Sequence, residues 1–311
     1  MPDVSVVDLG HNLHLIDAYL VDEPHRLACY LFDTPERVLI DCGPSRSIGH
    51  LFAALDYLGI DDVTLLALTH VHIDHAGGAG HFATRFPRAR IAVHPLGARH
   101  VADPARLVAS ATRAFGEQSM RDHWGPVEPV DPSRLLVLDE GDRIPLGDGR
   151  SIEVLHTPGH AKHHLIFSED ETGACLIGDE AGVAFPHSHA IQPATPAPDF
   201  DPQATAEQLR RIGARRPSLL GFAHYGPHPD PQAALAQAEQ RVWEWVSWIE
   251  QAGREEDIEE DITASFRRWV LDRHRVEGMP ETEVAVYDRH TYWTTQIDGI
   301  RRWIDRSGPV G

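Results

Sequence analysis

Four side chains that bind metals well, His70, His72, Asp74 and His75, lie within six residues, directly after the apolar run 63–68. Imidazole nitrogens and carboxylate oxygens are common ligands of divalent metal ions. In an extended segment, residues two apart point the same way, so His70 and His72 can reach one ion together. The chain then turns, and Asp74 and His75 can face a second ion. The spacing therefore predicts a metal site at the end of a buried strand.

The abundance of histidine makes any single one weak evidence, because the chain has 21 His among 311 residues. The pattern H-x-H-x-D-H is specific evidence, because chance rarely places these residue types at this spacing. Gly77 and Gly78 follow it, and they let the backbone leave the turn and start a helix packed closely against the site. His94 also follows a predicted strand, 90–93, but we interpret it as an ordinary surface histidine.

The segment T-H-x-H-x-D-H resembles the signature of the metallo-β-lactamase superfamily. The resemblance implies an α/β fold, an αββα sandwich with two metal ions at one sheet edge, over residues 1–227. It also implies three single ligands further along the chain, and the segments T-P-G-H, G-D and A-H-Y after predicted strands supply them. The implied metal ligands are His70, His72 and His160 for one ion, Asp74, His75 and His224 for the other, and Asp179 as a bridge between the two.

Residues near these ligands are candidates for supporting roles. Asp41 ends a strand before a glycine, and the resemblance implies that it supports the metal loop, which is compatible with capping a turn. His163 and His164 follow the T-P-G-H turn, and one of them is expected beside the site; His164, which precedes the strand 165–167, is the candidate catalytic residue. Tyr225 either orients the substrate or packs.

The order of the elements favours layered α/β architecture, because strands and helices alternate up to about residue 227. The Pro-rich segment 185–202 is expected to be either a lid or a stiff connector. Residues 228–311 form a helical C-terminal region, with helices predicted over 234–252, 257–276 and 281–306.

The composition is that of a soluble globular protein with a formal charge of −19, which disfavours nucleic-acid or anionic-membrane partners. The N-terminus does not read as a signal peptide, and no apolar run is long enough to span a membrane. Cys29, Cys42 and Cys175 are too few and too far apart for a disulfide framework. A cytoplasmic protein with a small-molecule substrate is expected.

Two metal ions lower the pKa of a bridging water from ~15.7 towards ~7, so the expected enzyme is a hydrolase that attacks an ester, thioester, lactone or phosphoester with a metal-bridging hydroxide. Asp74 is expected to handle the proton of that nucleophile. Zinc is the expected metal, with manganese or iron as alternatives. The helices after the core resemble those of glyoxalase II-like thioesterases. The alternative function is an oxidoreductase that resembles the persulfide dioxygenases and uses one non-haem iron. Tryptophans exposed on the C-terminal helices would favour a homodimer.

Overall fold

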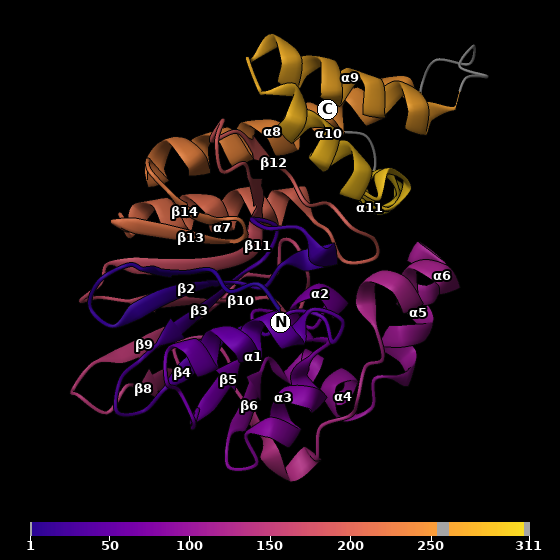
Figure 1. Cartoon of the computed structure of the whole chain (residues 1–311). Helices are drawn as coiled ribbons and strands as arrows, with labels where there is room; N and C mark the ends of the chain where they lie inside the picture. Colours follow the sequence, from indigo (N-terminus) through magenta and orange to yellow (C-terminus); the bar gives the residue numbers. More distant parts are fainter. Residues whose placement is uncertain (1, 254–260, 308–311) are drawn as a thin grey trace.

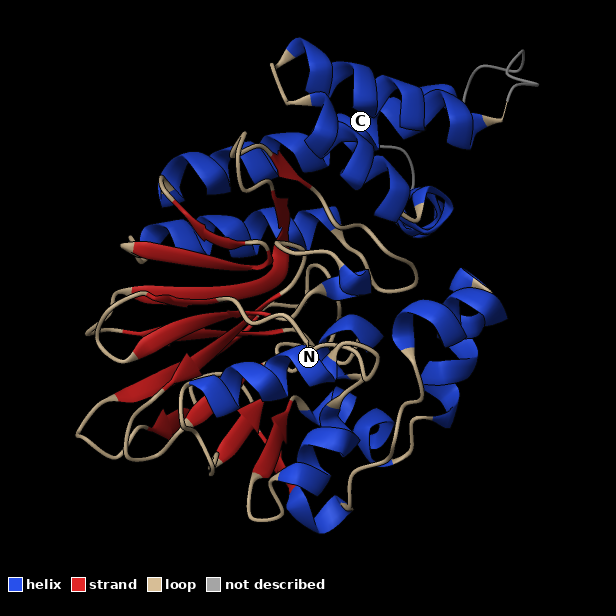
Figure 2. Cartoon of the chain, in the orientation of Figure 1, coloured by secondary structure: helices blue, strands red, loops and turns tan. Residues whose placement is uncertain are grey.

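Two β-sheets lie face to face, and helices cover their outer faces (Figures 1 and 2). The computed structural model describes residues 2–253 and 261–307. The predicted αββα sandwich with a helical C-terminal region is therefore confirmed.

The first sheet has the strand order β1-β2-β3-β4-β5-β6-β7. Its strands are β1 (Val6–Asp8), β2 (Leu13–Asp17), β3 (Ala28–Phe32), β4 (Val38–Ile40), β5 (Leu65–Ala67), β6 (Arg90–Val93) and β7 (Leu135–Val137). Successive side chains of a strand point to opposite faces. In β3, Tyr30 therefore packs between the two sheets, while Cys29 and Leu31 pack under the outer helices. Both faces of the central strands β3, β4 and β5 are buried, which explains why these strands read as continuous apolar runs.

The second sheet has the order β14-β13-β11-β10-β9-β8, and β12 pairs with β11. Its strands are β8 (Arg143–Pro145), β9 (Ser151–His156), β10 (Leu165–Glu169), β11 (Ala174–Ala184), β12 (Ile191–Gln192), β13 (Leu219–His224) and β14 (Gly226–His228). The sequence predicts a strand over 174–177. The predicted end at residue 177 is wrong. The strand continues to Ala184 because an irregularity at Gly178, with φ +52°, shifts its register without ending it.

The helices of the sandwich pack either on a sheet or, as the two helices within 105–119 do, on neighbouring helical segments. They are α1 (Ile48–Tyr57), α2 (Ile73–Ala76), α3 (Ala79–Arg85), α4 (Pro95–Ala102), α5 (Ala105–Phe115), α6 (Glu117–Ser119) and α7 (Pro202–Ala214). Short helical turns occupy Leu20–Asp22, Met120–Trp124 and Pro132–Arg134. In α1, Leu51 and Leu55 are fully buried.

The C-terminal helices are α8 (Pro231–Ala252), α9 (Ile262–Val276), α10 (Glu281–His290) and α11 (Trp293–Ser307). The single helix predicted over 281–306 is wrong. Thr291 ends α10, because its backbone is extended, with a ψ of 120°. Residues 257–260 of the predicted helix 257–276 lie outside the described residues. The division of the chain at residue 227 stays a prediction.

The aromatic rings of Trp245, Phe266 and Trp293 pack together and form the core of the C-terminal region. Within the described ranges, no helix combines the length and the apolar character that a membrane crossing requires.

Candidate metal centre

The predicted ligands come from strand ends, turns and a bulge. His70 follows β5, and His72 is the extended residue that precedes α2. Asp74 and His75 lie on the single turn of α2, so their side chains leave the loop in a different direction. Gly78 allows this turn to pack closely, because a Cβ there would overlap the side chain of Ile48.

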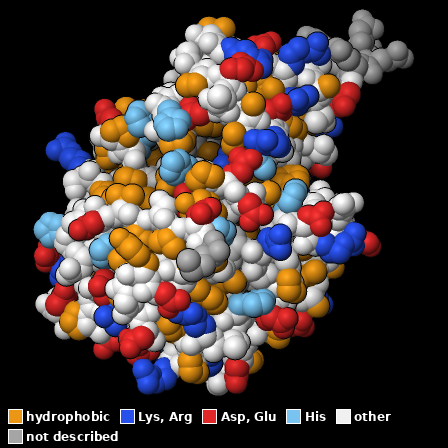
Figure 3. All heavy atoms as spheres, in the orientation of Figure 1, with side chains coloured by type: hydrophobic (Ala, Val, Ile, Leu, Met, Phe, Trp, Pro, Cys, Tyr) orange, Lys and Arg blue, Asp and Glu red, His pale blue; other side chains and the backbone are white. Residues whose placement is uncertain are grey.

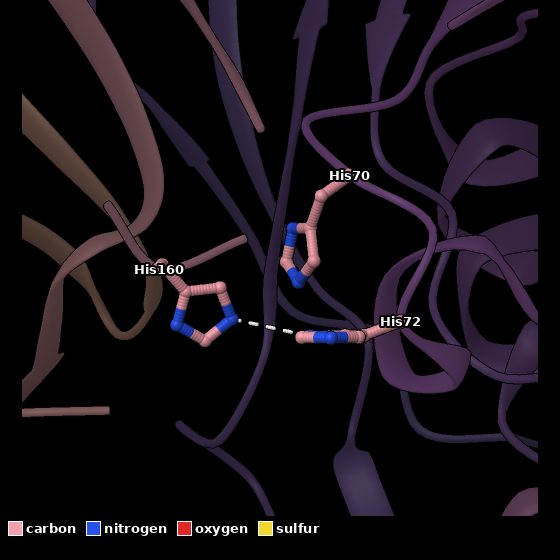
Figure 4. Close-up of side chains that lie close together, drawn as sticks. All are labelled: His70, His72 and His160. Carbon is pink, nitrogen blue, oxygen red and sulfur yellow. Dashed lines mark hydrogen bonds between the residues drawn. The ribbon is translucent and has the colours of Figure 1, made fainter. Parts of the chain in front are cut away.

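One group consists of His70, His72 and His160 (Figure 4). Their rings are close to perpendicular, with interplanar angles of 84°, 77° and 75°. His160 Nε2 lies 3.1 Å from His72 Nδ1. Ligand atoms that surround a tetrahedral ion at ~2.0 Å are ~3.3 Å apart. The spacing and the ring orientations fit one shared ion.

The second group consists of Asp74, His75, Asp179 and His224. His224 Nε2 lies 3.3 Å from Asp74 Oδ2, and His75 Nε2 lies 3.6 Å from the same oxygen. Asp179 connects the two groups. Its Oδ1 lies 3.3 Å from His75 Nε2, while its Oδ2 lies 3.6 Å from Nε2 of His160 in the first group. Each carboxylate oxygen therefore faces a different group.

Unpaired buried atoms provide an independent test of whether these residues fit metal ions. His70 Nε2, His75 Nε2 and Asp179 Oδ1 are buried without any hydrogen-bond partner. Leaving such polar atoms unpaired costs about 1–3 kcal/mol each, so buried polar atoms nearly always have partners. Divalent cations bound between these nitrogen and oxygen atoms would satisfy all three.

Partners outside the groups hold the rings in place. Asp41 Oδ2 accepts from His75 Nδ1 at 2.9 Å, and the two oxygens of Asp41 also accept from the hydroxyl and the amide of Thr69. The carbonyl of Arg26 accepts from His224 Nδ1 at 2.6 Å. Because Nδ1 donates, Nε2 of each ring keeps its lone pair for a metal.

The two groups differ in their protonation before metal binding. Burial lowers the pKa of His70 well below its usual value and that of His72 to about 4, and neighbouring histidines add to the effect. Burial also lowers the pKa of His75, but Asp179, Asp74 and Asp41 outweigh it and raise the pKa well above its usual value. The first group is therefore neutral, while the second contains an imidazolium among carboxylates.

The candidate catalytic residues lie in different environments. Asp74 is one of the two partly exposed members of these groups, with its side chain 24% accessible. His164 is fully buried; its Nε2 accepts from the amide of Asp179 at 3.1 Å, and its Nδ1 lies 2.8 Å from Thr157 Oγ1. His164 therefore contacts the backbone of a candidate ligand. The ring of Tyr225 lies 5.0 Å from that of His25 with their planes tilted by 48°, and burial raises the pKa of the Tyr225 hydroxyl.

The sequence analysis missed Glu180, which is 2% exposed beside the candidate bridge. Its Oε2 accepts from the amide of His160 at 3.3 Å, so it supports the T-P-G-H turn. Burial raises the pKa of Glu180 to about 8, although the amides of His160 and Gly159 oppose the shift. The sequence signal that could have revealed Glu180 is the presence of a glutamate within the mostly apolar segment 174–184.

The prediction that His94 lies on the surface is wrong. His94 is 4% exposed, because its ring stacks on that of His156 at 4.2 Å. Its Nδ1 accepts from the amide of Leu96 at the start of α4. His94, Asp139 and His156 also bring nitrogen and oxygen atoms close together.

The family model of the metallo-beta-lactamase superfamily matches residues 24–230. The chain belongs to this superfamily. A metallo-beta-lactamase fold-containing protein of Sulfurisphaera tokodaii is 28% identical over 219 residues, which cover 69% of this chain and 78% of that protein. An acyl-coenzyme A thioesterase of Gallus gallus is 32% identical over 184 residues, which cover 55% of this chain and 63% of the thioesterase.

The crystal structure of an archaeal superfamily protein from Sulfolobus tokodaii has a similar fold, with a TM-score of 0.67 and 23% identity. The match covers 94% of this chain and 99% of the archaeal one. Together with the clustered ligands, the family membership and the thioesterase relative support a metal-dependent hydrolase in general.

Proposed function

We propose that this protein is a dinuclear metal-dependent hydrolase that cleaves thioesters. The observation that carries the proposal is the orientation of Asp179, whose two oxygens face two different groups of ligands. A bridging carboxylate suits two cations ~3.5–4 Å apart, because each oxygen serves one ion and the negative charge reduces their repulsion. The similarity to an acyl-coenzyme A thioesterase supports thioesters over the lactones, other esters and phosphoesters that the same site could accept.

In this proposal His70, His72 and His160 hold one ion, Asp74, His75 and His224 hold the other, and Asp179 bridges them. Two such ions would supply a water of lowered pKa and would polarise the substrate carbonyl. Zinc is the proposed metal, with manganese or iron as alternatives. The side chain of Asp74 is 24% exposed, so its carboxylate would be accessible to the proton of the attacking water. His164 acts by holding the Asp179 amide, and Tyr225 orients the substrate.

The proposed substrate is a small molecule. Acidic and basic side chains are interspersed over the face of the molecule in Figure 3, and the formal charge is −19, so neither nucleic acid nor a membrane is proposed as a partner. A cytoplasmic location and a homodimer stay predictions.

The test combines metal content with activity on purified full-length protein. We expect about two ions per chain by elemental analysis, and release of free thiol from acyl-coenzyme A substrates in preference to lactone or phosphoester cleavage. Asp179→Asn should lower kcat/KM by more than about 100-fold, beyond the range for residues outside the ligand set. His94→Ala is the matched control and should retain activity. One iron per chain with persulfide-dependent oxygen uptake would contradict the proposal in favour of the oxidoreductase.

A further inference from the structure

The segment 185–202 lies between the C-terminal helices and the turn that carries His160. On the side of the metal centre, the carbonyl of Ala194 accepts from His160 Nδ1 at 3.0 Å. The amide of Asp201 donates to the carbonyl of Gly159 at 2.9 Å. The segment therefore contacts a candidate metal ligand directly.

On its other side, the same segment is held by α11. The amide of Thr195 donates to Gln296 Oε1 at 2.5 Å, and the hydroxyl of Thr195 donates to the carbonyl of Gln296 at 2.9 Å. Thr195 has no exposed surface. Gly299 allows this close approach, because a Cβ at that position would overlap the carbonyl oxygen of Thr195 and lie 2.9 Å from the carbonyl carbon of Pro196.

The two contacts meet in one peptide group. The carbonyl of Ala194 and the amide of Thr195 belong to the same planar unit, in which C=O and N–H are rigidly coupled. One end of this unit accepts from His160, and the other end donates to Gln296. Fixing the N–H therefore fixes the direction of the C=O, and hydrogen bonds in such a chain polarise one another.

We propose that Gln296 and Gly299 are positioning residues for the metal ligand His160, acting through the peptide group between Ala194 and Thr195. The peptide carbonyl keeps the proton of His160 on Nδ1 and directs Nε2 towards the first group. This inference rests on the proposed function in one respect, the role of His160 as a ligand. It assigns to the C-terminal helices a role in metal binding, and it makes the segment 185–202 a rigid connection.

Other contacts of the C-terminal helices reach the segment at different places and supply a control. Glu283 accepts from the amides of His187 and Ser188, and Gln237 Oε1 accepts from the amide of Ile191 at 2.7 Å. Ile191 is also held by the pairing of β12 with β11. Gln237 thus accepts from a backbone amide of the segment, as Gln296 does. At Ile191, however, the strand pairing also holds the backbone.

The experiment measures zinc affinity by competition with a chromogenic chelator, and the absorption of bound cobalt, in full-length Gln296→Leu, Gln296→Glu and Gln237→Leu. Gln296→Leu removes the acceptor and should weaken the ion bound by His160 by 10–100-fold, as is typical of partners that orient a ligand. It should also change the cobalt spectrum. Gln296→Glu keeps an acceptor and should restore most of the affinity. Gln237→Leu should bind both ions as the natural protein does.

A second pair of variants tests the close approach. Gly299→Ala should displace the connection and weaken the same ion, while Gly213→Ala on α7, whose Cβ would meet no atom nearer than 3.6 Å, should not. If a variant at 296 or 299 does not fold, Thr195→Val removes only the hydroxyl contact and should still shift the cobalt spectrum. Equal affinities and spectra in all folded variants would overturn the inference. A natural protein that binds two ions but hydrolyses no thioester would instead contradict the proposed function alone.

Discussion

Two clusters of histidine and aspartate in this protein bring potential ligand atoms close together, but their geometry differs. In the first group of the metal centre, the rings of His70, His72 and His160 are nearly perpendicular, at 75° to 84°. In the other cluster, the rings of His94 and His156 are stacked at 17°. The lone pair of an imidazole nitrogen lies in the plane of its ring, so perpendicular rings can converge on one ion, while stacked rings point side by side.

Hydrogen bonding separates the clusters as well. His70 Nε2 is buried without a partner, so a bound cation would satisfy it. His94 Nδ1 accepts from the amide of Leu96, which places the proton on Nε2, 3.7 Å from Asp139 Oδ1. His156 Nε2 donates to the carbonyl of Lys162 at 2.9 Å. The comparison teaches that proximity of ligand atoms is insufficient, and that ring orientation and unpaired nitrogens distinguish a metal site from a packed pair.

The largest effect should come from removing a ligand in each cluster. His70→Ala should lose at least one ion per chain and lower kcat/KM by more than about 100-fold, because it removes one of the three nitrogen ligands of the first group. His156→Ala should retain both ions and near-natural activity. Elemental analysis and thioester hydrolysis on the two variants check this, and loss of an ion from His156→Ala would reverse the comparison.

Acid should destabilise the metal-free protein through the first group. The folded pKa of His72 is about 4, lowered first by burial, against ~6.5 when unfolded. The unfolded state therefore binds more protons, so this contribution is complete above about pH 6.5 and is lost as the pH falls to about 4, by roughly 3 kcal/mol. His75 has the opposite effect on the pH dependence of stability, because the pKa of His75 is raised in the folded state.

Urea unfolding of chelator-treated protein at pH 7 and pH 4.5 measures this dependence. His72→Gln should reduce the loss of stability between the two pH values by about 2–3 kcal/mol. His94→Gln should reduce it less, because burial lowers the pKa of His94 by a smaller amount and Asp139 opposes that shift. An equal reduction in both variants would contradict the assignment to the first group.

Asp41 should matter more for metal affinity than Asp139, although both carboxylates face a histidine. Asp41→Asn disturbs the bonds that orient His75 and Thr69, and should weaken zinc binding by about 10–100-fold. Asp139→Asn should leave zinc binding unchanged. Chelator competition distinguishes the two, provided that thermal unfolding shows both variants folded.

The smallest effect concerns His94, whose role at the start of α4 is structural. His94→Ala removes the acceptor for the Leu96 amide and should cost about 1 kcal/mol of unfolding free energy, as loss of a helix cap does. Metal content should stay the same. A loss of stability below a few tenths of a kcal/mol would contradict this structural role.

The sequence by itself determined the layered α/β architecture and the metal loop, because both depend on short-range patterns, and the resemblance to the superfamily implied the αββα arrangement and the ligands His160, Asp179 and His224. Apolar runs of strand length marked the buried strands, and the spacing of His70, His72, Asp74 and His75 marked the metal loop. The T-P-G-H and G-D segments could be located by their places after predicted strands. The break at Thr291 escaped because the helical pattern continues across it, while the backbone at that residue is extended.

Only the tertiary structure decided which nitrogen of each ring faces the centre and how Asp179 divides its oxygens. These features depend on partners far away in the sequence: Asp41 for His75, Arg26 for His224 and Ala194 for His160. Burial of Glu180 and His94 likewise depends on neighbouring elements. A ring's tautomer follows from whichever group meets its second nitrogen, and the chain spacing around that ring does not specify this group.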